Sequence, residues 1–318
     1  MIRRSILMLA AMCLVPAAMA QSWTTKPIKL IVNFPAGTGA DTIARSFAKG
    51  LGDRLGQPLV VENKVGAAGN IGVDTVARAA PDGYTLLWTP GSALVTNMFL
   101  YKVEAPKVQA IAYPYFQALP LVVRADSQFK TAASIQEFAK ANPNKVRYGS
   151  AGLGSPMHLA ALMWMSQAGF KAEHIPYKST GEAVVALING DIDFYFDAGP
   201  AIPFVKQGKL RSIALASHTR SPLHPGVPTM EEASGAKVDT ALPGGLYAPM
   251  NTPAEIVKVL HSAGEKVWMD PQYKQALAGI YAEPSSTYPS PPQIEALLVA
   301  DRERIGKLIR EAGVAIEK

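Results

Sequence analysis

Short apolar runs alternate with amphipathic stretches along most of the chain after residue 21. Residues 28–34 predict a buried strand, residues 42–55 a helix with one apolar face, and residues 59–62 a second strand. A helix at 72–80 and a strand at 85–88 continue the alternation. Strands that alternate with helices in this way indicate an α/β fold built on a parallel sheet.

A second series of the same kind begins near residue 119. It predicts strands at 121–124, 146–150, 174–176, 192–196 and 212–216, and helices at 131–141, 156–167, 181–188 and 202–207. The remaining chain predicts a short helix from residue 229, a strand at 245–248, and helices at 253–269, 271–278 and 291–312.

The two series predict an α/β protein of two lobes, each a sheet flanked by helices. Three strands are too few for the first lobe, so we expect the C-terminal part of the chain to return and complete it. The first lobe then comprises residues 21–120 plus 242–318, and the second comprises residues 121–241. We expect two crossings, near residues 119 and 241, and a cleft between the lobes.

Residues 1–20 have the pattern of a secretory signal peptide. Arg3 and Arg4 precede an apolar run at 6–15, and an Ala-Met-Ala cleavage site ends at Ala20. The alternative, an N-terminal membrane anchor, is disfavoured because the apolar run is shorter than the roughly 20 residues that a span needs. We expect export to the periplasm and cleavage after Ala20. The sole cysteine, Cys13, would leave with this segment, so the mature chain would hold no disulfide or thiol chemistry.

Composition and charge narrow the functional class. The chain is 48% apolar and 18% charged, which excludes a disordered protein. Without residues 1–20, 29 Lys and Arg stand against 25 Asp and Glu, a net charge near +4. These basic residues are scattered instead of forming a stripe, so we expect no nucleic-acid partner. A mildly cationic exported protein suits small anionic ligands.

The first chemical signal is the loop Phe-Pro-Ala-Gly-Thr-Gly-Ala-Asp at residues 34–41, between the first strand and the first helix. Gly37 and Gly39 permit a tight turn and leave amide hydrogens uncovered at a helix N-terminus, which attracts anions. The loop is neither a Walker loop nor a dinucleotide fingerprint, because the required Lys-Ser/Thr and third Gly are missing. The alternative is a plain turn in which Asp41 caps the helix.

The second lobe carries a similar loop, Tyr-Gly-Ser-Ala-Gly-Leu-Gly-Ser-Pro-Met-His, at residues 148–158. We expect Ser155 to cap the following helix, with Pro156 at its first position. Loops at 65–72 and 89–92 lie at the same sheet end as the first loop, where α/β proteins bind ligands. Asp197 ends a strand of the second lobe and is either a helix N-cap or a group that binds ligand or water.

Catalytic and metal motifs are missing. Neither Ser150 nor Ser155 fits the Gly-x-Ser-x-Gly pattern of a nucleophile elbow. A histidine three residues after a serine, as His158 is after Ser155, is more often a residue on a helix face than a general base. The five histidines show no HExxH motif and no close pairing along the sequence. We therefore expect no catalytic residues, no metal site and no cofactor.

The motifs together resemble the substrate-binding proteins of tripartite tricarboxylate transporters, also called Bug receptors. The resemblance rests on KPIKLIVNFPAGTGAD at 26–41, GQPLVVEN at 56–63, GNIG at 69–72, APDGYT at 80–85 and Gly154-Ser155 with His158. Further matches fall at 176–178, 189–191, 208–211, 227–231 and 248–249, so the resemblance spans essentially the whole mature chain.

This resemblance implies a type II periplasmic binding protein of the Venus flytrap kind, a monomer that closes on a small carboxylate. The implied partners are the membrane components of a tripartite tricarboxylate-type transporter or, alternatively, a sensor protein. A periplasmic enzyme acting on organic acids is the remaining alternative.

In that family, amides and hydroxyls of the two glycine-rich loops hold the ligand carboxylate, partly through waters. Carried over, the ligand-binding residues are Gly37, Thr38, Gly39, Ala40, Asp41, Gly154 and Ser155, with Phe34, Asn70, Ser92, Ser150 and Asp197 as further wall residues. The family usually reads Pro-Gly-Gly-Gly-Thr/Ser-Asp at the first loop. Here Ala36, Thr38 and Ala40 differ, and the hydroxyl residue next to Asp41 is absent.

Overall fold

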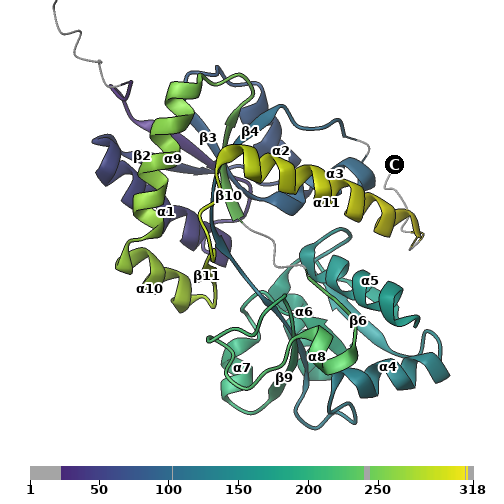
Figure 1. The fold of residues 1–318 in the computed structure, drawn as a ribbon. Coiled ribbons are helices and arrows are strands. Elements are labelled where there is room, and N and C mark those ends of the chain that lie inside the picture. The colour runs from purple at the N-terminus through teal and green to yellow at the C-terminus, as the bar shows by residue number, and fades with distance from the viewer. Residues whose placement is uncertain (1–22, 102, 240–243, 312, 314–318) are drawn as a thin grey trace, which may run out of the picture.

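The computed structural model describes residues 23–101, 103–239, 244–311 and 313, which form two β-sheets flanked by helices (Figure 1). The first sheet has the order β11-β4-β10-β3-β1-β2 and the second the order β7-β6-β8-β5-β9. The predicted signal segment lies outside the described residues. We call each sheet with its helices a lobe.

The strands of the first sheet are β1 (Ile28–Val32), β2 (Leu59–Asn63), β3 (Thr85–Pro90), β4 (Val108–Phe116), β10 (Gly244–Pro249) and β11 (Glu283–Pro284). Those of the second sheet are β5 (Leu119–Arg124), β6 (Arg147–Ser150), β7 (Glu173–Pro176), β8 (Phe194–Phe196) and β9 (Leu210–Ala216).

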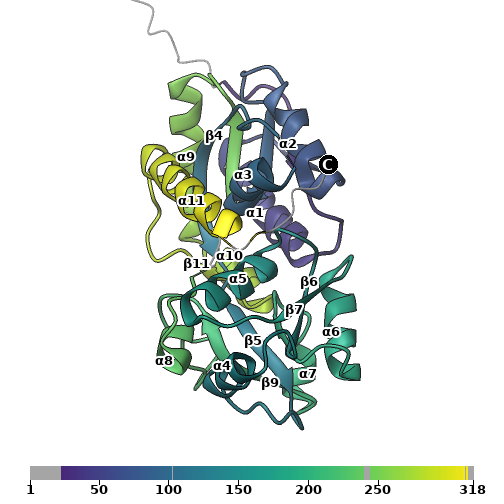
Figure 2. The ribbon, with the colours of Figure 1, turned by 90° about the vertical axis from the view of Figure 1, so that its right-hand side faces the viewer.

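Helices cover both sheets (Figures 1 and 2). With the first sheet lie α1 (Gly39–Leu55), the 3-10 turn η1 (Ala67–Gly69), α2 (Asn70–Ala77), α3 (Gly91–Leu100), α9 (Ala254–Trp268), α10 (Pro271–Gly279) and α11 (Pro291–Glu311). With the second lie α4 (Ala132–Ala141), α5 (Pro156–Ala168), α6 (Thr180–Asn189), α7 (Ile202–Lys206) and α8 (Met230–Ser234).

Both sheets are mixed, whereas the alternation of strands and helices predicted a parallel sheet in the first lobe. Strand β1 pairs in parallel with β2 and β3, as the alternation of strands and helices predicts. The expected return strand is β10, which inserts between β3 and β4 and runs antiparallel to both. In the second sheet β6 is parallel to β7 and β8, whereas β5 is antiparallel to β8 and β9. Only the strands linked by crossover helices are parallel.

The first helix shows how local sequence sets an element. Ile43, Phe47 and Leu51, the predicted apolar face, are buried in the first lobe. The helix begins at Gly39, three residues before the predicted start, because Thr38 is the N-cap residue. It ends where Gly56 adopts a left-handed conformation with φ 68°, a common helix terminator.

The chain changes sheet between β4 and β5, at residues 117–118. The second predicted crossing, near residue 241, lies outside the described residues, and the division at 120/121 and 241/242 stays a proposal. Helix α11 also links the lobes, because it packs on α3 and on α5. Leu308 of α11 joins the core of the second lobe, and Arg304 donates to the carbonyl of Asp239 at 3.1 Å.

Most of each lobe packs around its own apolar residues, apart from Leu308 of α11 in the second-lobe core and Leu159 of α5 in a first-lobe cluster. Trp164 meets Phe194 and Phe196 edge-on in the second lobe, and Trp88 stacks on Tyr115 in the first at 5.8 Å between centroids. Replacing such an aromatic side chain by alanine typically costs about 3–5 kcal/mol. The lobes are thus stable frames for the loops at their strand ends. In the described part of the chain no helix has the length and apolar character of a membrane span.

Candidate functional site

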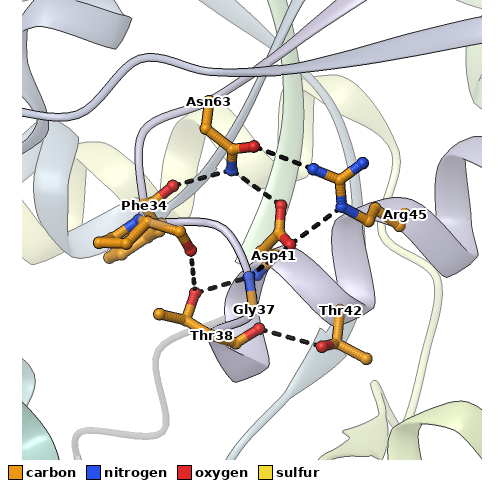
Figure 3. A network of polar contacts seen from close by, with 8 residues as sticks. Phe34, Gly37, Thr38, Asp41, Thr42, Arg45 and Asn63 are labelled. Atoms are coloured by element: carbon orange, nitrogen blue, oxygen red, sulfur yellow. Dashed lines mark hydrogen bonds and ion pairs between the residues drawn. The ribbon is translucent and has the colours of Figure 1, made fainter.

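The first glycine-rich loop lies at the carboxyl end of β1 and leads into α1 (Figure 3). Val32 pairs with Trp88, so β3 ends beside it. Asn33 donates from Nδ2 to Thr89 Oγ1 at 2.9 Å and links the two strand ends. This edge of the first sheet is the position that parallel α/β sheets use for ligands.

Asp41 holds this loop in shape from inside the protein. Its carboxylate, only 3% exposed, accepts from Gly37 N at 2.9 Å, Arg45 Nε at 2.9 Å and Asn63 Nδ2 at 2.8 Å (Figure 3). Asn63 Nδ2 also donates to the carbonyl of Phe34 at 2.9 Å. Burial raises the pKa of Asp41, but the hydrogen bonds from Arg45, Asn63 and Gly37 outweigh it and lower the pKa. Asp41 is therefore an internal anion that closes the loop onto α1.

Thr38 is the N-cap of α1, a role that one interpretation of the sequence assigned to Asp41. Its Oγ1 accepts from Asp41 N at 3.4 Å and donates to the carbonyl of Pro35 at 2.9 Å. The Thr38 hydroxyl and the Gly37 amide are thus both engaged within the loop.

The free donors of this loop are the amides of Gly39 and Ala40. Within the described chain neither donates to a protein acceptor, because both stand in the first turn of α1. The helix N-terminus adds about half a positive charge there. Gly37 has a left-handed φ of 80°, whereas Gly39 is helical and needs no glycine conformation.

A strained turn follows β2 at residues 66–69. Gly66, Ala67, Ala68 and Gly69 have φ values of 122°, 46°, 53° and 88°. A non-glycine residue in this region costs about 1–3 kcal/mol, so the surroundings must hold it. Asn97 of α3 does so, donating from Nδ2 to the carbonyl of Ala68 at 3.0 Å.

The predicted wall residue Asn70 directly follows this turn. The Asn70 side-chain oxygen accepts from Asn97 Nδ2 at 2.9 Å, and this bond holds the side-chain amide group of Asn70 at the start of α2. Ser92, another predicted wall residue, lies in the first turn of α3. The sequence analysis missed Asn97, because its contact with residues 68–70 depends on how α3 packs.

The second glycine-rich loop links β6 to α5 and confirms the predicted cap. Ser155 is the N-cap of α5, its Oγ accepts from His158 N at 3.4 Å, and Pro156 occupies the first turn. Gly152 and Gly154 have φ values of 104° and 73°, so the loop uses glycine where the backbone is left-handed.

Two histidines contact this loop through hydrogen bonds. Gly154 N donates to His158 Nδ1 at 3.0 Å, and Ser150 Oγ lies 2.7 Å from His174 Nε2. The rings of His158 and His174 stack at 4.2 Å, and Tyr148 stacks on His174 at 4.9 Å. No local pattern predicts this pairing, because 16 positions separate the two histidines.

Both histidines are neutral at pH 7. Burial and then the neighbouring His174 lower the pKa of His158 to about 3, and burial lowers the pKa of His174 to about 4. Ser150 and His174 resemble a nucleophile and its base, but Ser150 Oγ also donates to the carbonyl of Gly152 at 3.0 Å and accepts from Gly152 N at 3.1 Å, so it holds its own loop together. No group of three potential metal ligands occurs in the described residues.

The second loop offers donors beside the predicted Ser155 hydroxyl. The Gly154 amide donates to His158, whereas Ser155 Oγ accepts from His158 N and its own O–H makes no hydrogen bond among the described residues. The amides of Ala151 and Leu153 donate to no protein acceptor in the described part of the chain. Each lobe thus has backbone amides available to an anion at the entrance to a helix.

Asp197 follows β8, whose register pairs Gly149 with Tyr195 and so brings Asp197 to the edge where β6 enters its loop. It is 0% exposed, and its Oδ2 accepts from Gly199 N at 2.8 Å and Ala201 N at 3.1 Å. Asp197 is not the N-cap of α7, because that residue is Ala201. Burial raises its pKa to about 6 against the opposing hydrogen bonds.

Ile280, which follows α10, lies between elements of both lobes. A methyl group placed on Gly39 would be 3.8 Å from Ile280 Cδ1, and one on Gly199 would be 3.8 Å from the Ile280 carbonyl. Gln117, at the crossing between sheets, donates to the carbonyls of Ile280 at 3.1 Å and Ala198 at 3.3 Å. The first loop and the Asp197 turn therefore share a neighbour.

The second glycine-rich loop also contacts the first lobe. A methyl group on Gly154 would lie 3.0 Å from Thr96 Cγ2 of α3, one residue before Asn97. Helix α3 therefore touches the strained turn at 66–69 on one side and the second loop on the other.

A cavity of about 640 Å³ lies apart from these loops, in a groove between α1 and the edge strand β2. Its lining includes Arg45, Lys49, Asp53 and Leu59. Lys49 and Asp53 pair with each other at 3.0 Å, so this groove carries little unpaired charge.

Sequence comparison matches most of the chain to one family model and to several relatives. Residues 43–314 match the family model described as the tripartite tricarboxylate transporter family receptor. A Cupriavidus necator protein, "UPF0065 protein in gbd 5'region", is 37% identical over 84% of this chain and 82% of its own length. Protein BugT of Bordetella pertussis is 32% identical, covering 94% of this chain and 93% of its own.

Solved structures show the same fold. The periplasmic binding protein BugD is 29% identical with a TM-score of 0.78, covering 92% of this chain and 99% of its own. An R. palustris protein solved with adipate has 27% identity and a TM-score of 0.81, with the same coverages of 92% and 99%. MatC from Rhodopseudomonas palustris, with bound malate, has 25% identity and a TM-score of 0.77, covering 90% and 99%. These matches confirm the predicted binding-protein fold.

Proposed function

This chain belongs to the tripartite tricarboxylate transporter receptors, a family of periplasmic solute-binding proteins, and from that premise we propose that it captures a small organic acid between its two lobes. The acid would then pass to the membrane components of a tripartite tricarboxylate-type transporter. We propose further that the protein is exported with cleavage after Ala20, acts as a monomer and catalyses no reaction.

The observation that carries this proposal is the pair of glycine-rich loops with free backbone amides, one in each lobe. Gly39 and Ala40 offer two amides at the start of α1, and Ala151 and Leu153 offer two before α5. Amides at helix N-termini are suited to carboxylates, because the peptide dipoles favour negative charge there. The bound adipate and malate of two structural relatives support an acid as the ligand class.

The energetics are adequate for a receptor. A hydrogen bond to a charged group contributes about 1.5–3 kcal/mol, and a micromolar dissociation constant corresponds to about 8 kcal/mol. Two to four such bonds contribute about 3–12 kcal/mol, and because association itself costs about 4 kcal/mol or more, apolar contacts along the ligand must supply the remainder. The contacts of Ser150 Oγ with Gly152 in its own loop support binding without turnover.

We expect organic acids to raise the melting temperature of the purified protein. An acid at 100 times its dissociation constant stabilises the folded state by about 2.7 kcal/mol, which corresponds to several degrees in Tm. Differential scanning fluorimetry with mono-, di- and tricarboxylates, aromatic acids and amino acids measures this effect. Neutral sugars are the controls, and stabilisation by sugars alone would contradict the carboxylate proposal.

A further inference from the structure

One carboxylate oxygen of Asp197 accepts hydrogen bonds from the protein, and the other has no hydrogen-bond partner among the described residues. Oδ2 accepts two backbone amides, from Gly199 and Ala201. Oδ1 is buried and has no hydrogen-bond partner among the described residues. An unsatisfied buried oxygen of this kind costs about 1–3 kcal/mol, and more when it is charged. A donor from outside the protein would remove this cost.

The position of this oxygen ties it to the proposed site. Asp197 stands at the same sheet edge as the entrance to the second loop, because Gly149 and Tyr195 are paired neighbours. Its turn reaches the Ile280 carbonyl through Gly199, and the Ile280 side chain lies against Gly39 of the first loop. The turn that follows Asp197 and the first loop therefore both lie near Ile280.

Charge and neighbouring groups indicate what would complete Asp197. Its pKa of about 6, raised by burial, leaves it ionised at pH 7.5, and no ion pair to it is found in the described chain. The hydroxyl of Tyr195, two residues earlier on the same strand, is also buried without a partner. An ionised acceptor rejects a second carboxylate and favours a hydroxyl or an ammonium group.

We infer that the ligand is an organic acid that also carries a hydroxyl or ammonium group, and that Asp197 Oδ1 accepts a hydrogen bond from that group. This inference rests on the proposed function, because the loop amides must first hold the ligand carboxylate. It makes Asp197 a specificity-determining residue that distinguishes hydroxy and amino acids from plain acids. The retained contacts of Oδ2 explain how one side chain can both hold its turn and recognise the ligand.

The test compares acids that differ by one donor group. Calorimetric titration at pH 7.5 would measure dissociation constants in three sets. The first compares L-malate and L-aspartate with succinate, the second compares L-lactate and L-alanine with propionate, and the third compares mandelate with phenylacetate. In at least one of these sets we expect the donor-bearing acid to bind tenfold or more tightly than its plain partner. A site built to pair a ligand donor discriminates strongly against the analogue that lacks it.

The variant Asp197→Asn sharpens the test. Its amide oxygen keeps an acceptor for Gly199 and Ala201, while its NH₂ group replaces Oδ1 with a donor. We expect the preference for the hydroxy or amino acid to fall at least tenfold, with a plain dicarboxylate bound as well or better. Asp191→Asn is the matched control, because Asp191 is an exposed acid just before β8. The ligand preference of this variant should equal that of the unchanged protein.

The outcomes separate the two proposals. Acids bound with equal affinity in every set would overturn the role of Asp197 and leave the carboxylate receptor standing. Binding of no acid in the panel would overturn both. An Asp197→Asn protein that keeps its circular dichroism spectrum and its original preference would show that Asp197 only holds its turn.

Discussion

Replacing Gly39 by Asp should weaken binding of the acid by at least tenfold to a hundredfold. Gly39 is the first residue of α1, and its amide has no acceptor within the described protein. An aspartate there places a like charge where the ligand carboxylate would lie. Loss of one charge-assisted hydrogen bond costs about 1.5–3 kcal/mol, and repulsion adds to it. Isothermal titration calorimetry measures the change directly.

Gly39→Ala is the matched control for this variant. Gly39 is helical with no left-handed φ, and an added methyl group meets only Ile280 Cδ1 at an ordinary 3.8 Å. Alanine therefore introduces neither strain nor charge, and we expect it to bind within a few-fold of the unchanged protein. If the Asp and Ala variants, both folded by circular dichroism, bind the acid equally well, the first loop does not hold the carboxylate.

Replacing Asp41 by Ala should both destabilise the protein and weaken binding. The change leaves Gly37 N, Asn63 Nδ2 and Arg45 Nε without their shared acceptor. Three lost bonds, partly replaced by water at the half-exposed Arg45, correspond to about 2–4 kcal/mol of unfolding free energy. Affinity should fall as well, because the released loop no longer presents the Gly39 and Ala40 amides. Thermal unfolding and calorimetry report the two effects separately.

Asp53→Ala is the control for the Asp41 prediction. Asp53 lies on the same helix and pairs with Lys49 at an i,i+4 spacing, but both side chains are exposed. Such pairs contribute about 0–1 kcal/mol, so this variant should differ little from the unchanged protein. Equal losses in the two variants would contradict the proposed role of Asp41 in closing the loop.

Acid pH gives the Asp41 network a second signature. Because the folded pKa of Asp41 lies below the ordinary value of 3.8, its stabilising effect is fully present above that pH and is lost as pH falls through the folded pKa. The difference in unfolding free energy between the unchanged protein and the Asp41→Asn variant should therefore narrow below about pH 4.

Local sequence predicted the first lobe's loop and helix because their causes are local. The apolar spacing of Ile43, Phe47 and Leu51 fixes the buried face of α1, and Gly37 marks the left-handed turn before it. The strand β4 was missed, because Pro114 interrupts its apolar run and no helix separates it from β5. Its place in the sheet depends on β10, which comes from more than 100 residues later.

The chemistry of the candidate site was predictable by region and not by atom. The pattern identified both glycine-rich loops, yet it could not show that Asp41 takes the Gly37 amide or that His158 takes the Gly154 amide. These contacts decide which amides remain free, and the second depends on the left-handed turn at Gly154. The Ser150 contact with His174 joins two strands and has no local signal.

The most direct test of the account is a crystal structure of the protein with an acid that stabilises it. We expect the carboxylate oxygens at about 3 Å from the amide nitrogens of Gly39 or Ala40, and from those of the second glycine-rich loop. An acid bound instead in the outer groove between α1 and β2, near Arg45 and Lys49, with both loops free of ligand, would contradict the account.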